Sequence, residues 1–102
     1  MEWFHYLSGF FAGIFLANAV PHFIQGISGN KFPTPFAKPP GKGLSPAPVN
    51  VIWGLVNMLI GYCLFRKAEI SMDNTVSMLV LFAGIAVISI PLSVHFQHKD
   101  QA

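Results

Sequence analysis

Three long stretches of this chain contain no Asp, Glu, Lys or Arg. They are residues 3–30, 43–65 and 74–98, and the six basic and four acidic residues all lie outside them. Each stretch is long enough for the roughly 20 apolar residues with which a helix crosses a bilayer. A charge at the bilayer centre costs about 2.5 kcal/mol or more, so lipid selects for such gaps. The pattern predicts an all-α membrane protein with three transmembrane helices.

The composition supports this prediction and excludes a soluble helical bundle. Only 10% of the residues are charged and 53% are hydrophobic, whereas soluble domains carry about 25% charged residues. The few basic residues are dispersed along the chain, which argues against nucleic acid as a partner. We expect one membrane domain over residues 1–102, with the lipid bilayer as its surroundings.

The predicted spans cover residues 3–27, 49–65 and 76–94. Pro48 suits the first turn of the second span, where its missing N–H has no helical partner. Pro91 predicts a kink or an early end in the third span. The first stretch lacks the basic flank and the cleavage site of a signal peptide, so we expect it to remain as a span.

The longest connection, residues 28–48, holds six of the eight prolines and is expected to be a proline-rich loop. Residues 32–36 should be extended, because proline fixes its own φ and disfavours helix in the preceding residue. Phe32 and Phe36 indicate a loop lying against the membrane surface or the helix ends, with a solvated linker as the alternative. The short connection 66–74 predicts a tight antiparallel hairpin of the second and third spans.

Basic residues predict the orientation. The side with the long loop and the C-terminus carries four lysines, and the other side carries Arg66 and Lys67. The positive-inside rule then places the N-terminus outside and the long loop and C-terminus in the cytoplasm. The four lysines are Lys31, Lys38, Lys42 and Lys99.

Small residues recur every four positions in the first span, at Gly9, Gly13 and Ala17. This spacing allows two helix backbones to approach closely in lipid. The contact lies either within the chain or between copies of it. Asn18 and His22, with Gln25, occupy a second face of the same span, which favours a homo-oligomer or a larger membrane complex.

The second span carries a stripe that is both small and polar. Asn50, Gly54, Asn57 and Gly61 fall within a narrow arc at about 100° per residue. The stripe predicts either a close helix contact with hydrogen-bonded amides or a water-lined path facing an oligomer axis. Asn57 lies deep in the span and needs a partner there.

Three of the four histidines are expected near one membrane interface. His22 ends the first span, and His95 and His98 follow the third span, which runs in the same direction. The three are candidate metal ligands, although no Asp, Glu or Cys stands beside them. Histidine also lies at interfaces simply to reach water. We predict no cofactor, and no cofactor-binding residue is assigned.

No catalytic motif accompanies these features. Gly41 and Lys42 match the end of a phosphate-binding loop, but Phe36 stands where that motif needs its first glycine. No Ser, His and Asp set has an intelligible arrangement. We therefore expect no enzymatic activity and no catalytic residue.

Several short motifs lie at the end of the first span, in the loop and at the start of the second span. They are Pro21-His22-Phe23 with Gly26 and Gly29, Phe32-Pro33-Thr34-Pro35-Phe36-Ala37, Pro39-Pro40-Gly41-Lys42-Gly43, and Asn50 with Trp53-Gly54. This pattern resembles a group of small bacterial membrane proteins without an established function. The resemblance implies a multi-pass protein of the bacterial inner membrane and marks the long loop as its distinctive part. It implies no ligand or activity.

The sequence therefore favours a non-enzymatic helper or interaction subunit of a membrane complex that associates with itself. One alternative is a minimal oligomeric channel or transporter with Asn50 and Asn57 along its axis. A second alternative is a metal- or quinone-binding protein that uses the interfacial histidines.

Overall fold

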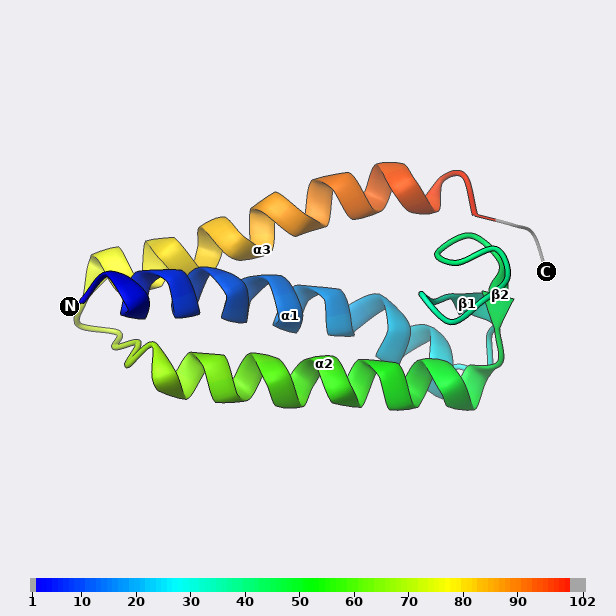
Figure 1. Cartoon of the computed structure of the whole chain (residues 1–102), viewed down its shortest axis with the longest axis horizontal. Coiled ribbons are helices and arrows are strands. Elements are labelled where there is room, and N and C mark those ends of the chain that lie inside the picture. The colour runs from blue at the N-terminus through cyan, green and yellow to red at the C-terminus, as the bar shows by residue number, and fades with distance from the viewer. Residues whose placement is uncertain (1, 100–102) are drawn as a thin grey trace.

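The computed structural model describes residues 2–99. Three long helices and one small sheet follow each other along the chain (Figure 1): α1 (Trp3–Ile27), β1 (Phe32–Pro33), β2 (Leu44–Ser45), α2 (Ala47–Lys67) and α3 (Thr75–Phe96). Each helix is long and apolar enough to cross a membrane. The domain predicted over residues 1–102 includes Met1 and residues 100–102, which lie outside the described part.

The helix bounds agree with the predicted spans at the first helix and extend them at the other two. Pro48 lies in the first turn of α2, next to its N-terminal residue Ala47. Pro91 lies inside α3, which continues to Phe96 and so does not end early. Asn74 begins α3 by accepting a hydrogen bond from the Ser77 amide at 3.2 Å, which satisfies one of the free donors of the first turn.

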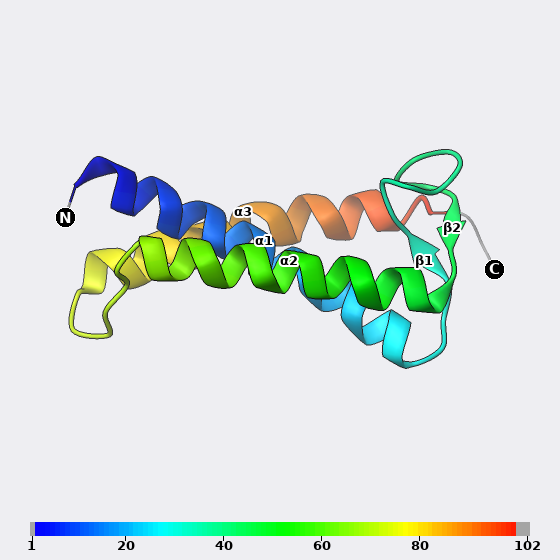
Figure 2. The same ribbon diagram turned by 60° about the horizontal axis from the view of Figure 1, so that its bottom comes forward.

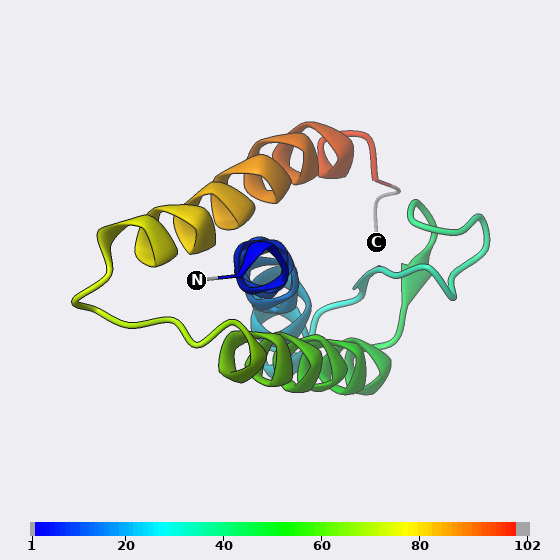
Figure 3. The same cartoon turned by 60° about the vertical axis from the view of Figure 1, so that its left-hand side comes forward.

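α1 lies between the other two helices, as the end-on view in Figure 3 shows. Both α2 and α3 pack along α1 and hardly against each other. The predicted tight hairpin of the second and third spans is therefore wrong. The reason is that α1 has small residues on two faces: Gly13 lies against the α3 backbone, and Gly26 lies against the start of α2.

The segment between α1 and α2, residues 28–46, folds back over one end of the bundle (Figure 2). β1 and β2 pair antiparallel, with Phe32 opposite Ser45. Phe32 is buried and its ring lies 4.6 Å from the ring of Phe96 at the end of α3. Phe36 is exposed but its ring lies 5.1 Å from that of Trp53 on α2.

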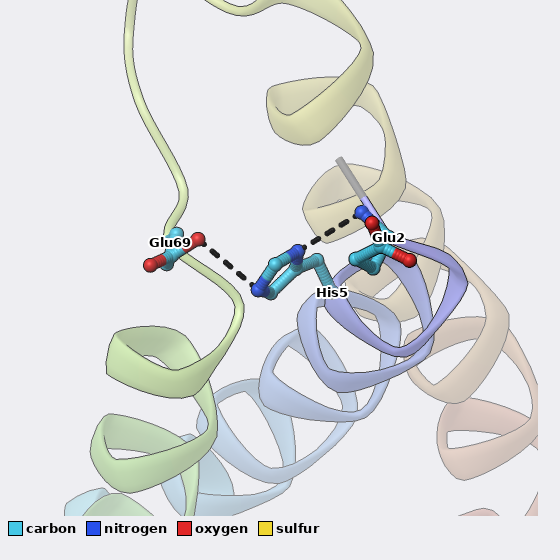
Figure 4. A network of polar contacts seen from close by, with 3 residues as sticks. All are labelled: Glu2, His5 and Glu69. Atoms are coloured by element: carbon cyan, nitrogen blue, oxygen red, sulfur yellow. Dashed lines mark hydrogen bonds and ion pairs between the residues drawn. The ribbon is translucent and has the colours of Figure 1, made fainter.

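A different polar contact closes the opposite end of the bundle (Figure 4). The Glu2 amide donates to His5 Nδ1 at 3.1 Å, and His5 Nε2 lies 3.1 Å from a carboxylate oxygen of Glu69. This contact ties the start of α1 to the connection between α2 and α3. His5 therefore lies far from the other three histidines.

Candidate functional site

Asn50, in the first turns of α2, is the centre of a buried polar cluster. Its side chain is fully buried. The amide nitrogen Nδ2 lies 2.9 Å from the Phe32 carbonyl and 3.2 Å from the Ser45 carbonyl, so Asn50 holds both strands of the sheet. A buried amide needs such partners, because leaving it unpaired is costly. Asn50 thereby joins segment 28–46 to α2.

The side-chain oxygen of Asn50 determines which ring nitrogen of His22 carries the proton in the neutral form. Because Nδ2 is the donor to the carbonyls, Oδ1 faces His22 Nδ1, at 2.9 Å. An amide oxygen only accepts, so Nδ1 carries the proton. In a neutral ring the other nitrogen, Nε2, then presents a lone pair. No hydrogen bond to Nε2 is found among residues 2–99.

A second amide pair lies deeper in the helices, about one turn along α1 and about two turns along α2. Asn57 donates to the Trp53 carbonyl at 2.8 Å and accepts from Asn18 Nδ2 at 3.1 Å. Asn18 Oδ1 has no hydrogen bond from the part of the chain that the structure describes. The indole nitrogen of Trp53 is also buried without a hydrogen-bond partner there.

These groups surround a small inner cavity of about 170 Å³. Side chains from all three helices and from segment 28–46 form its wall, with Asn18, His22, Thr34, Trp53, His95 and Phe96 among them. None of its lining residues is Asp, Glu, Lys or Arg. The cavity is therefore lined by no permanently charged side chain. Its wall offers hydrogen-bonding groups and the edges of aromatic rings.

A larger outer hollow of about 560 Å³ adjoins this cavity. It follows α1 from Leu16 to Pro21 and α3 from Ile85 to Phe96. Its lining is apolar except for Ser89 and Ser93, whose hydroxyls bond to carbonyls of their own helix. Leu92 and Phe96 border both hollows, so the two meet at these side chains.

The structure does not assemble the candidate metal ligands into one group. His22 bonds to Asn50, whereas His95 Nε2 lies 2.6 Å from the Gly41 carbonyl. Within residues 2–99, no group of three His, Cys, Asp or Glu side chains is arranged to hold a metal ion. His98 is exposed and lies beyond the end of α3.

The small-residue positions lie inside the chain. Gly13 faces Leu81 and Ile85 of α3, with room for no more than a hydrogen atom. A Cβ at Gly9, by contrast, would make only ordinary contacts at 3.6 Å or more. Gly54 lies against Phe23 and Gly61 against Leu16, both on α1. Ala17 lines the outer hollow.

Several residues of the site were missed by the sequence analysis. Thr34 and Ser45 are buried and share a hydrogen bond of 2.6 Å between their hydroxyls. Trp53 and Phe96 form cavity wall, but in the sequence they resemble any aromatic residue of a membrane helix. The run of prolines around Thr34 was the one available signal that this hydroxyl belongs to an ordered segment.

Comparisons with known proteins do not identify the site: no family model, no curated protein and no solved structure matches the chain.

Proposed function

We propose that the chain is a small multi-pass protein of the bacterial inner membrane with a non-enzymatic role, acting as a helper or interaction subunit of a membrane complex. In this proposal α1, α2 and α3 cross the bilayer. Segment 28–46 and the C-terminus face the cytoplasm, and the N-terminus lies outside.

The observation that carries the proposal is the uncovered apolar surface of α3. In the most apolar stretch of α3, 11% is buried within the chain, whereas in the corresponding stretch of α1 33% is buried. Leu79, Phe82 and Ile90 are among the exposed side chains of α3. Lipid solvates such side chains, but helices in lipid also gain from packing against another helix. A helix so little covered by its own chain favours contact with a second chain.

The position of the polar stripe of α2 favours the interaction role over the channel alternative. Asn50, Gly54, Asn57 and Gly61 are all buried. Their neighbours are α1 and segment 28–46, so this stripe is already covered within one chain. Contacts within one chain therefore account for this stripe, which supports the interaction role.

Disulfide crosslinking in native membranes tests the interaction role. The native thiol, Cys63, is exposed and is first replaced by Cys63→Ser. In that background we expect Phe82→Cys to form a covalent adduct with a second copy or another protein, which mass spectrometry then identifies. The matched control is Ala12→Cys, whose position is fully buried against the chain's own helices and should give no adduct.

The proposal fails if Phe82→Cys, Leu79→Cys and Ile90→Cys all remain uncrosslinked and the native mass in mild detergent is that of one chain. A shared adduct at several of these positions would instead define the contact face along α3.

A further inference from the structure

We propose that the inner cavity and the outer hollow together form a binding site for a neutral lipid whose compact head carries a hydroxyl or carbonyl oxygen. The head occupies the inner cavity beside Trp53 and His22. The apolar chain lies along α1 and α3 in the outer hollow. This site goes beyond the interaction role and does not depend on it.

The free hydrogen-bonding groups define the head. Trp53 lines the inner cavity, and its indole N–H is buried without a partner in the described chain. A buried donor of this kind is uncommon in proteins and calls for an acceptor. The nitrogen has almost no accessible surface in the free protein, so in this proposal the Trp53 ring shifts slightly and a hydroxyl or carbonyl oxygen of the head supplies that acceptor. A hydroxyl hydrogen in turn fits the lone pairs of His22 Nε2 and Asn18 Oδ1, which the amides of Asn50 and Asn57 leave free.

The size of the inner cavity limits the head to a compact group. A cavity of about 150 Å³ binds one benzene molecule, so about 170 Å³ holds a single small ring or a short polar group. The His22 ring lies 6.4 Å from the Trp53 ring and 6.1 Å from the Phe96 ring, both in edge-on pairs. Such ring edges favour a flat or apolar head over a bulky sugar.

The absence of permanently charged side chains from both hollows disfavours the common ionic lipids as ligands. No Lys or Arg lines either hollow, and the two histidines of the inner wall, His22 and His95, carry no permanent charge, so a phosphate or carboxylate placed there would lack a permanent counter-ion. Burying an unpaired charge is far more costly than burying a hydroxyl that finds partners. The site therefore discriminates against phospholipid heads and ionised fatty acids.

The outer hollow is suited to the chain of such a lipid. Its volume of about 560 Å³ lies within the range of about 300 to 1,000 Å³ found for small-molecule sites. The hydroxyls of Ser89 and Ser93 are occupied by their own helix, so the lining offers an incoming chain mainly dispersion contacts. Its junction with the inner cavity at Leu92 and Phe96 places the end of the chain next to the head.

The test compares three probes that share a decyl chain: 1-decanol, a decyl-substituted benzoquinone and decanoate. Retention of each probe by the full-length protein is measured by native mass spectrometry from mild detergent over a concentration series. We expect at least one neutral probe to bind about tenfold more tightly than decanoate. Binding of decanol alone identifies a hydroxyl head, and binding of the benzoquinone alone identifies a carbonyl ring.

Two substitutions locate the binding. Trp53→Phe removes the indole N–H and should weaken the neutral probe about tenfold, the effect of losing one buried hydrogen bond. The matched control, Trp3→Phe, changes an exposed tryptophan and should leave binding unchanged. Ser89→Leu fills the outer hollow from an exposed position and should weaken every probe, with helix content by circular dichroism unchanged.

The proposal is overturned if no probe is retained, or if decanoate binds as tightly as the neutral probes. Unchanged binding in both Trp53→Phe and Ser89→Leu overturns it as well. Should Trp53→Phe fail to fold, Ser89→Leu alone decides whether the probe lies in this site.

Discussion

At the scale of single residues, Asn50 connects α2 to α1 and to segment 28–46 by hydrogen bonds alone. One amide contacts α1 through His22 and both strands of segment 28–46 through the Phe32 and Ser45 carbonyls. Its second function is to select a tautomer, because in the neutral ring it leaves the proton of His22 on Nδ1. The polar character of the inner cavity therefore depends on a residue outside its wall.

Replacing Asn50 by Ala should lower the free energy of unfolding. The substitution leaves His22 and two carbonyls without their partner in a buried place, and each such loss costs about 1–3 kcal/mol. We expect a clear fall in the midpoint of thermal unfolding in mild detergent. The control is Asn30→Ala, which removes an amide whose bond to Gln25 is exposed. Equal midpoints for the two variants would contradict the role given to Asn50.

At the scale of secondary-structure elements, the close contact of α1 with α3 depends on glycine. A Cβ at Gly13 would lie 2.9 Å from the Ile85 backbone nitrogen and even closer to the Leu81 carbonyl oxygen. From the α3 side, a Cβ at Gly84 would collide with the Phe10 carbonyl. All three atoms belong to backbone, which cannot turn aside as a side chain does. The two helices must separate to admit even one methyl group.

The Gly13→Ala variant should therefore be less stable by about 1–3 kcal/mol, the usual cost of overpacking a closely packed contact. Gly9→Ala makes the same chemical change one turn earlier, where the nearest atoms are 3.6 Å away, and should be neutral. Unfolding of both variants in the same detergent measures the difference. If Gly13→Ala were as stable as Gly9→Ala, the tight approach of α1 and α3 would be refuted.

The elements also show what the sequence can predict and what it cannot. Charge-free stretches predict the three helices, because charge is what lipid excludes most strongly. The arc of Asn50, Gly54, Asn57 and Gly61 correctly picks out the buried positions of α2, since polar and small residues mark an inner face. In α3 nearly every residue is apolar, so periodicity gives no inner face to read.

The inner cavity was beyond prediction for a related reason. Its wall combines Trp53, Thr34 and Phe96, which are far apart in the chain and become neighbours only when α1 lies in the middle. The order of helices in space follows from close contacts at Gly13, Gly26 and Gly84. Sequence spacing identifies these residues as small but does not tell which helix each one meets.

At the scale of the whole molecule, the two ends differ in kind. One end carries the buried cluster, segment 28–46 and most of the lysines. The other has the exposed contact of His5 with Glu69, beside Arg66 and Lys67 at the end of α2. This asymmetry gives the proposed membrane orientation its direction, because cytoplasmic loops carry the excess of basic residues.

Reporter fusions check that orientation in bacterial cells. Green fluorescent protein inserted after Asn30 should fluoresce, because it folds in the cytoplasm. Alkaline phosphatase inserted after Ser71 should be active, because it folds outside. Reciprocal insertions are the controls and should give little signal. The reverse pattern would invert the orientation, and cytoplasmic signals at both positions would contradict the three-span arrangement.

The central place of α1 has a consequence for how the protein is made. The ribosome delivers α1 before α2 and α3, so the helix that both others contact is the first one available for packing. When α2 follows, Asn18 and His22 already stand ready for Asn57 and Asn50. Folding generally proceeds from the N-terminus during synthesis, so α2 and α3 can each pack against α1 without rearrangement of an earlier helix. A nascent chain stalled once Lys67 has left the ribosome should accordingly already resist protease within segment 28–46.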